Sequence, residues 1–432
     1  MEIFAIIVFI LGYLGIAFEH PLKIDKAAFA LITGVLCWTV YVFTGLSDAD
    51  TIHNSLSHHL SEISEILFFL IGAMTIVELV DVHGGFKIIT DKITTKNTKK
   101  LLWIIGILSF FMSAALDNLT TSIVMISLLR KLIKDQKLRW FFAGIVIIAC
   151  NAGGAWSPIG DVTTTMLWIK GQTPSTINLI VDLILPSLVS LIVPLAVLSF
   201  VLKGEVERPD KLDGEHHHHH QPTTAGERWS VFLLGLSALL FVPVFKVITH
   251  LPPFMGMMLG LGVMWGFTEL LHHKKSLESK QGFSVTAVLR KIDTASVLFF
   301  LGILLAVSAL QELGFLRTLA QFLDEKLNNI YAINMAIGLL SALVDNVPLV
   351  AAAQGMYEIS TVADSPFAAD GTFWLFLAYC AGTGGSSLII GSAAGVAVMG
   401  LEKISFGWYL KTITPWAILG YLAGAIFYIF LH

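Results

Sequence analysis

The sequence predicts an all-α polytopic membrane protein built from two inverted repeats. Three observations lead to this fold class: a low content of charge, a series of long apolar segments, and motifs that occur once in each half. Of the 432 residues, only 13% are charged and 55% are hydrophobic, whereas a soluble domain has about 25% charged residues. This charge is too sparse to cover a soluble surface of this size, so the lipid bilayer is the expected surrounding.

Charge and cysteine content exclude several other classes of protein. A formal net charge of −4 argues against nucleic-acid binding, which requires a basic face. The three cysteines, Cys37, Cys150 and Cys380, lie in apolar segments without paired spacing, so neither a disulfide framework nor a zinc site is expected. Glu2 stands where a signal peptide would carry basic residues, and we therefore interpret 2–18 as a retained first span.

Twelve segments can enter the membrane. A helix needs about 20 apolar residues to cross the hydrocarbon core. Eight segments fit this description simply: 2–18, 27–45, 62–81, 177–202, 229–249, 254–271, 293–313 and 408–431. Four longer segments are interrupted midway by Gly, Pro or carboxylates: 100–130, 140–169, 330–357 and 372–400.

The positions of Lys and Arg predict the topology, because cytoplasmic loops retain positive charge. Segments 83–100 and 130–139 carry five basic residues each, so 100–130 is predicted to be a re-entrant hairpin that enters from the cytoplasm. The flanks of 330–357 carry few basic residues, and this second hairpin is predicted to enter from outside. With 140–169 and 372–400 crossing once each as broken helices, 23 of the 27 basic residues lie inside. Both termini are then predicted to lie outside.

Related motifs occur in both halves. SAALDN at 113–118 recurs as SALVDN at 341–346, and CNAGGAWSPIGD at 150–161 recurs as CAGTGGSSLIIGS at 380–392. Residues 1–202 and 229–432 are therefore predicted to be inverted repeats, each with five crossings and one re-entrant hairpin, and with discontinuous helices at the midplane. Such an arrangement is typical of secondary transporters, which expose one midplane site to each side in turn.

Residues 203–228 join the two halves as a predicted cytoplasmic linker. The linker contains the run His216 to His220. A histidine run can bind a transition metal, but we interpret this one as a linker feature or an engineered tract.

Carboxylates deep in the membrane indicate the site, because each costs about 2.5–3.5 kcal/mol to insert. Asp117 and Asp345 lie at the predicted hairpin tips and Asp161 in the first broken helix, and we expect these three to hold Na⁺ or Li⁺. Ser392 occupies the matching position in the second broken helix, so the site is expected to be asymmetric.

Small hard cations prefer oxygen ligands, and several oxygen-bearing side chains surround these positions. They are Ser113, Asn118, Asn151, Thr163, Thr164, Ser341, Asn346, Ser386 and Ser387. Asp293 and Thr294, which open a second-half span, are secondary candidates. The plainer alternative for Asn118 or Asn346 alone is a hairpin cap.

Desolvation disfavours the charged form of a carboxylate. A proton and a metal cation would therefore compete for the same oxygens. Exchange would then follow without a separate proton path, and no cofactor is expected.

The DN tips, NAGGAWSPIGDVTTTMLW at 151–168 and SALVDNVPLVAAA at 341–353 resemble the NhaD-type sodium/proton antiporters of the ion transporter superfamily. The likeness covers nearly the whole chain, from GYLGIAFEHPLKIDKAA at 12–28 to the last span. It implies extrusion of Na⁺ or Li⁺ in exchange for protons, in a bacterial inner membrane. It also implies that the family's functional polar residues fall at Asp117, Asn118, Asn151, Asp161, Thr163, Thr164, Asp293, Thr294, Ser341, Asp345 and Asn346. The wider superfamily suggests a homodimer with a scaffold and a moving transport domain.

Three other functions are alternatives to cation exchange. A dicarboxylate or arsenite carrier of the same superfamily is disfavoured because the tip carboxylates would repel a dianion and no Lys or Arg is predicted at the midplane. An intramembrane aspartyl protease often carries GxGD, but PIGD at 158–161 lacks the first glycine, and hydrolysis would leave the repeat unexplained, so no enzyme is expected. A passive channel would differ from an exchanger in that it shows no coupled flux.

Overall fold

The structure is a computed structural model of the chain, and its described part is helical, with two isolated β-bridges. The described residues are 2–17, 19–45, 48–202, 204–209, 223–273, 283–343 and 345–432. The predicted all-α class is therefore confirmed. The run His216 to His220 lies outside the described residues.

Eight helices of the described residues are long and apolar enough to cross a membrane, so the chain is a multi-pass membrane protein. They are α3 (Lys26–Thr44), α4 (Ala49–Val82), α6 (Thr98–Leu116), α10 (Thr176–Val201), α11 (Ala225–Thr249), α12 (Pro253–Leu271), α15 (Thr294–Glu312) and α22 (Thr414–Leu431). Seven of them coincide with predicted simple spans. The eighth, α6, forms the first arm of a predicted hairpin.

Three predicted spans differ in length from the helices observed. The first, α1 (Glu2–Ala17), has only 16 residues. Helix α4 begins at Ala49, well before the predicted start at 62, because its polar first half packs against α15, where His59 Nε2 lies 2.9 Å from a Glu312 carboxylate oxygen. The predicted span 408–431 is divided into α21 (Phe406–Thr412) and α22. Pro415 lies in the first turn of α22, where its missing N–H is tolerated.

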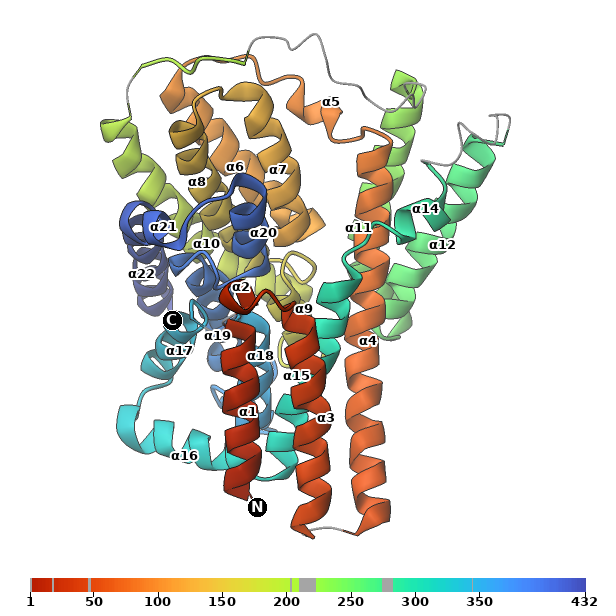
Figure 1. Cartoon of the computed structure of the whole chain (residues 1–432), viewed down its shortest axis with the longest axis vertical. Coiled ribbons are helices and arrows are strands. Elements are labelled where there is room, and N and C mark those ends of the chain that lie inside the picture. The colour runs from red at the N-terminus through yellow and green to blue at the C-terminus, as the bar shows by residue number, and fades with distance from the viewer. Residues whose placement is uncertain are drawn as a thin grey trace.

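Both motifs ending in Asp-Asn connect two helices, as predicted. In the first pair, α6 is followed by α7 (Asn118–Leu132), and in the second, α17 (Ile330–Leu340) is followed by α18 (Asn346–Met356). Helices α6 and α7 occupy the upper half of the molecule and α17 and α18 the lower half, with the two tips near the middle (Figure 1).

Each half also contains an interrupted helix. The first consists of α8 (Gln136–Gly154) and α9 (Val162–Ile169); the second consists of α19 (Thr372–Gly384), the short η1 (Gly385–Ser387) and α20 (Ala393–Glu402). Gly153 lies against the carbonyl of Phe110, and Gly384 lies against that of Gly338, so closely that a Cβ at either position would clash. These glycines let each interrupted helix lie directly on the first helix of its pair.

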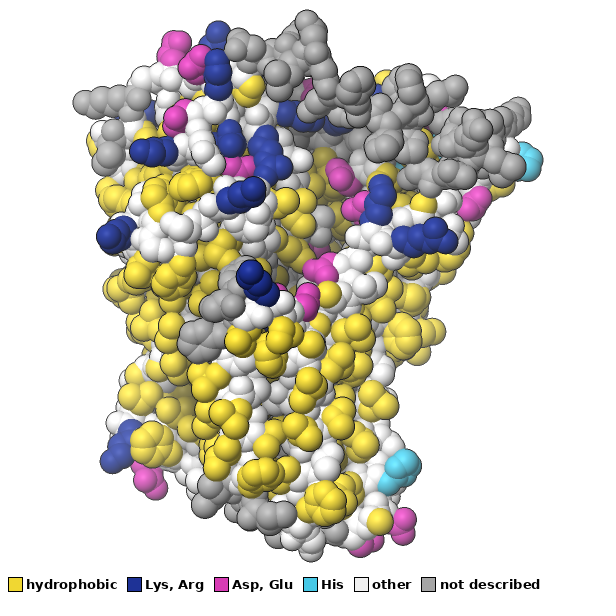
Figure 2. All heavy atoms as spheres, in the orientation of Figure 1, with side chains coloured by type: hydrophobic (Ala, Val, Ile, Leu, Met, Phe, Trp, Pro, Cys, Tyr) yellow, Lys and Arg dark blue, Asp and Glu magenta, His cyan; other side chains and the backbone are white. Residues whose placement is uncertain are grey.

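The remaining helices are short: α2 (Glu19–Leu22), α5 (Lys87–Thr90), α14 (Val285–Leu289) and α16 (Phe315–Leu327). The three cysteines are free and buried. Lys and Arg side chains gather toward the upper end of the face seen in Figure 2, and hydrophobic side chains cover much of the surface below.

Candidate functional site

The centre of the candidate site is the carboxylate of Asp161, which joins the tips of both helix pairs. Asp161 is 2% exposed, and its Oδ1 accepts a hydrogen bond from the Thr163 backbone N–H at 3.2 Å, which caps α9. Its Oδ2 accepts from Asn118 Nδ2 at 3.1 Å and from Asn346 Nδ2 at 3.3 Å. Asn118 opens α7 and Asn346 opens α18, so one oxygen atom contacts two elements far apart in the sequence.

Asn151 connects this centre to the second interrupted helix. Asn118 Nδ2 also donates to Asn151 Oδ1 at 3.1 Å. Asn151 Nδ2 in turn donates to Ser386 Oγ at 3.0 Å and to Ser392 Oγ at 2.9 Å. We call these buried residues the central network: Asn118, Asn151, Asp161, Asn346, Ser386 and Ser392. Both helix pairs and both interrupted helices contribute residues to this network.

At the first tip, Asp117 caps α7 and has a strained backbone. Its Oδ1 accepts from the Thr120 N–H at 2.7 Å, and its Oδ2 accepts from the Thr120 hydroxyl at 2.8 Å. Asp117 has φ = 79° and ψ = 160°, a region that costs a non-glycine residue about 1–3 kcal/mol. The two bonds to Thr120 help to hold this conformation.

At the second tip, Asp345 caps α18 and also pairs with a lysine. Its Oδ1 accepts from the Val347 N–H at 3.3 Å, and its Oδ2 lies 3.3 Å from Lys26 Nζ. The expectation that no Lys or Arg approaches the site was therefore wrong. The reason is tertiary: residues 19–26, which connect the first two predicted spans, lie at mid-height of the molecule between α1 and α3 (Figure 1).

Two predicted serines bind backbone carbonyls and not the carboxylates. Ser113 Oγ donates to the carbonyl of Cys150 at 2.6 Å and so attaches α6 to the neighbouring interrupted helix. Ser341 Oγ lies 2.7 Å from the carbonyl of Gly338 in its own helix and 3.2 Å from that of Ala381, so its contact with the second interrupted helix is the weaker of the two.

The predicted threonines are buried beside Asp161, whereas the residues at the start of α15 are not part of the network. Thr163 and Thr164 form the first turn of α9, and among the described residues the Thr164 hydroxyl has no hydrogen-bond partner. Ser387 is buried, and its carbonyl accepts from Thr414 Oγ1 at 2.6 Å. Asp293 and Thr294 are exposed, and Asp293 caps α15 by accepting from the Ser296 N–H at 3.0 Å.

The three predicted carboxylates do not converge on one point. Across the described ranges, no three His, Cys, Asp or Glu side chains lie close enough together to hold a metal ion. Asp117 and Asp345 nevertheless lie near enough to act electrostatically on Asp161. A cation at the network would therefore be held by one carboxylate and neutral oxygens.

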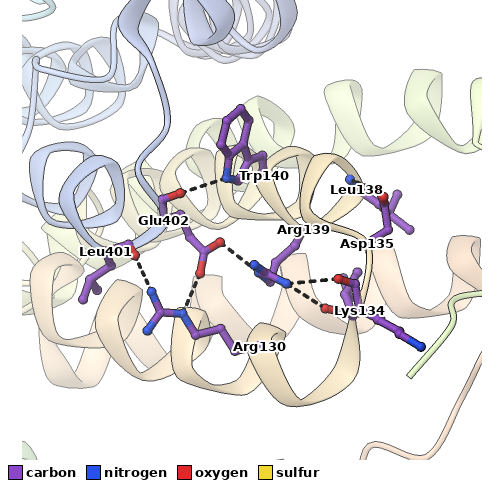
Figure 3. Close-up of polar contacts among 9 residues, drawn as sticks. Arg130, Lys134, Asp135, Leu138, Arg139, Trp140, Leu401 and Glu402 are labelled. Carbon is purple, nitrogen blue, oxygen red and sulfur yellow. Dashed lines mark hydrogen bonds and ion pairs between the residues drawn. The ribbon is translucent and has the colours of Figure 1, made fainter. Parts of the chain in front are cut away.

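An ion-pair cluster that the sequence did not indicate connects α20 to the end of α7 and the start of α8 (Figure 3). The Glu402 side chain is 1% exposed and contacts Arg130 Nε at 2.7 Å and Arg139 Nε at 2.8 Å. Its backbone carbonyl accepts from Trp140 Nε1 at 2.9 Å. The only sequence signal was that Glu402 directly precedes the basic Lys403. This cluster holds the far end of the second interrupted helix against the first half.

Comparison with known proteins identifies the family. A family model described as "Citrate transporter" matches residues 6–374. The chain is 49% identical to "Sodium/proton antiporter 1" of Arabidopsis thaliana, over 99% of this chain and 72% of that protein. It is 46% identical to "Sodium/proton antiporter 2" of the same plant, over 99% of both, and 31% identical to "Na(+)/H(+) antiporter NhaD" of Vibrio cholerae, over 99% of this chain and 91% of that protein. The chain therefore belongs to the transporter family of the NhaD-type sodium/proton antiporters, as its motifs suggested.

Proposed function

We propose that the protein exchanges Na⁺ or Li⁺ for H⁺ at the central network, where the metal cation and the proton compete for Asp161. The observation that carries this proposal is the single carboxylate oxygen that accepts amide N–H groups from both tips, Asn118 and Asn346. Replacement of the metal cation by a proton at that oxygen would change the contacts of both helix pairs together. An exchanger requires such a coupling between the bound ion and the helices around it.

The chemistry of the network favours a cation over an anion. A buried carboxylate is costly unless hydrogen bonds, a proton or a cation compensate its charge. The groups that donate to Asp161 are neutral amides, so a monovalent cation or a proton would complete the neutralisation. The carbonyls and hydroxyls of the interrupted helices supply further oxygen ligands.

We also propose that 1–202 and 229–432 are inverted repeats, joined by the linker 203–228. Matching close contacts support the repeat: Gly154 lies against the carbonyl of Gly160 in the first half, and Gly385 against that of Gly391 in the second. The placement of the two helix pairs in opposite halves of the molecule supports their inversion (Figure 1). Asp161 and Ser392 are the N-caps of α9 and α20, with side chains that accept from the Thr163 and Gly395 N–H groups, so only the first repeat supplies a carboxylate at this position.

The upper end of the molecule is proposed to be cytoplasmic, because basic side chains gather there (Figure 2). The first hairpin would then enter from the cytoplasm and the second from outside, and the N-terminus, at the lower end of the molecule, would lie outside (Figure 1). That the C-terminus also lies outside stays a prediction, because it ends near mid-height in this view. Single cysteines at Lys134 and Asp364 should be labelled by an impermeant maleimide from opposite sides. Labelling of both from one side would contradict the topology.

The remaining assignments rest on resemblance alone. A homodimer stays a prediction, and so does the bacterial inner membrane, because the relatives include plant as well as bacterial proteins. Cross-linking in membranes tests the first, and the native membrane fraction tests the second.

The decisive experiment measures pH changes inside proteoliposomes with Na⁺, Li⁺ and K⁺ gradients. An outward Na⁺ or Li⁺ gradient should drive protons inward, and Asp161→Asn should abolish this movement. Asp364→Asn, which alters an exposed loop, is the matched control. Wild-type exchange in Asp161→Asn would contradict the proposed site.

An anion carrier is the second candidate, because the matching family model is described as a citrate transporter. The same vesicles distinguish the two functions. Citrate uptake without any Na⁺-driven proton movement would favour the anion carrier.

A further inference from the structure

Lys26 has no role in the exchange described so far, although it contacts a tip carboxylate. Its Nζ lies 3.3 Å from Asp345 Oδ2, and the two side chains are 17% and 10% exposed. The same ammonium lies over the ring of Phe299, 4.3 Å from the centroid. An ion pair this well shielded is costly to separate, because each partner would lose its neutralising charge in a poorly hydrated place.

Lys26 also lies between two cavities. A cavity of about 40 Å³ is lined by Tyr13, Glu19, Lys26 and Asp345, together with apolar side chains. A second cavity of about 160 Å³ is lined by Glu19, Lys26, Asp25 and Asp293. The first has room for only a few small species, since one water needs about 10–15 Å³ of such space.

The charges around Lys26 would attract cations. The larger cavity carries three carboxylates and one ammonium, and a cavity with an excess of one sign of charge concentrates the opposite ion. Glu19 and Lys26 line both cavities. Lys26 therefore borders both the acidic cavity and the cavity that Asp345 lines.

We propose that Asp345 is a second point on the transported ion's route to Asp161, and that Lys26 is a tethered cation that competes with the ion there. With no ion bound, its ammonium neutralises Asp345. When Na⁺ or H⁺ neutralises this carboxylate, Lys26 is released toward Glu19 and Asp25 on the same cavity walls. Lys26 thereby sets the apparent affinity for Na⁺, and this inference rests on the proposed function.

The competition can be measured through the Na⁺ dependence of exchange at one fixed pH. Lys26→Gln removes the competitor, so its apparent KM for Na⁺ should fall about fivefold, which corresponds to about 1 kcal/mol. Lys26→Arg keeps the charge and should stay close to wild type. Lys23→Gln, which removes an exposed lysine from the same turn, is the matched control.

Two results would overturn the inference. A lower maximal rate with unchanged KM in Lys26→Gln would show a merely structural role. Equal KM changes in Lys26→Gln and Lys26→Arg would show that the charge is not the operative property.

If Lys26→Gln does not transport, ²²Na⁺ binding to the purified protein decides the question. Tighter binding than wild type supports the competition, and unchanged or weaker binding overturns it. A wild type that moves no protons under a Na⁺ gradient would refute the proposed function. Wild-type exchange together with an unchanged KM in Lys26→Gln would refute only this inference.

Discussion

The two helix tips have nearly the same sequence but different electrostatic surroundings. SAALDN and SALVDN both end in an Asp that caps the next helix and an Asn that donates to Asp161. Asp117, however, adopts φ = 79° and is bound by Thr120, whereas Asp345 has φ = −23° and pairs with Lys26. The Asp carboxylate of the first tip is bound by residues of its own helix, whereas that of the second tip is paired with the ammonium of Lys26 in α3.

This difference shows which properties of the tips are local. The Asp cap and the Asn at the start of the helix follow from the Asp-Asn sequence, because capping involves only the next few residues. The third residue after the tip Asp is Thr120 in the first pair and Pro348 in the second. Proline has neither a hydroxyl nor an N–H to bind Asp345, so the second carboxylate depends on another element.

The largest expected effect is loss of exchange in Asp117→Asn and in Asp345→Asn. Each substitution removes the tip carboxylate beside an asparagine that binds Asp161, and with it a negative charge that attracts a cation, so Na⁺-driven proton movement should be abolished while the protein still inserts. Asp345→Asn should in addition lower the unfolding temperature, because it leaves Lys26 unpaired. Exchange assays and thermal unfolding of both variants test this; wild-type-like exchange in both would contradict the site assignment.

A smaller loss of exchange is expected when the tip asparagines, Asn118 and Asn346, are replaced by alanine. Asn118→Ala removes donors to both Asn151 and Asp161, whereas Asn346→Ala removes the donor to Asp161 alone. A buried polar group left without its partner costs about 1–3 kcal/mol, so we expect exchange to fall about tenfold in Asn346→Ala and further in Asn118→Ala. The measurement is the initial rate of Na⁺-driven pH change at equal protein content. The opposite order would show that the second tip dominates.

A still smaller loss of exchange is expected from a substitution of Thr120, which binds the Asp of the first tip and has no counterpart at the second. Thr120→Val keeps the shape but removes the hydroxyl that donates to Asp117 at 2.8 Å, and a hydrogen bond to a charged group contributes about 1.5–3 kcal/mol. Because the backbone N–H of Thr120 still binds Asp117, we expect only about a threefold loss of exchange, which corresponds to about 0.6 kcal/mol and lies below that range. Thr120→Ser should restore the rate. No change in Thr120→Val would mean that the backbone bond alone holds the first tip.

The smallest effect on transport is expected from substitution of Glu402, because this residue stabilises the fold and lies outside the central network. Glu402→Gln removes a buried charge between Arg130 and Arg139, and we expect the free energy of unfolding to fall by about 1–3 kcal/mol, since both arginines retain some contact with solvent. Glu207→Gln, in an exposed pair with Lys134, is the control and should change stability by less than about 0.5 kcal/mol. Thermal unfolding in detergent compares the two. Equal stability of both variants would contradict a role for the cluster in holding α20.

The sequence by itself determined the membrane class, most spans, the interruptions at both Asp-Asn motifs and the polar residues of the network. These follow from hydropathy over one helix length and from capping over a few residues. Only the tertiary structure decided that Asp161 is the shared centre, that Asp293 stays apart, that Lys26 reaches Asp345 and that Glu402 joins two arginines. Those contacts link residues far apart in the chain, and their energies depend on which helices pack together, a property that no local pattern contains.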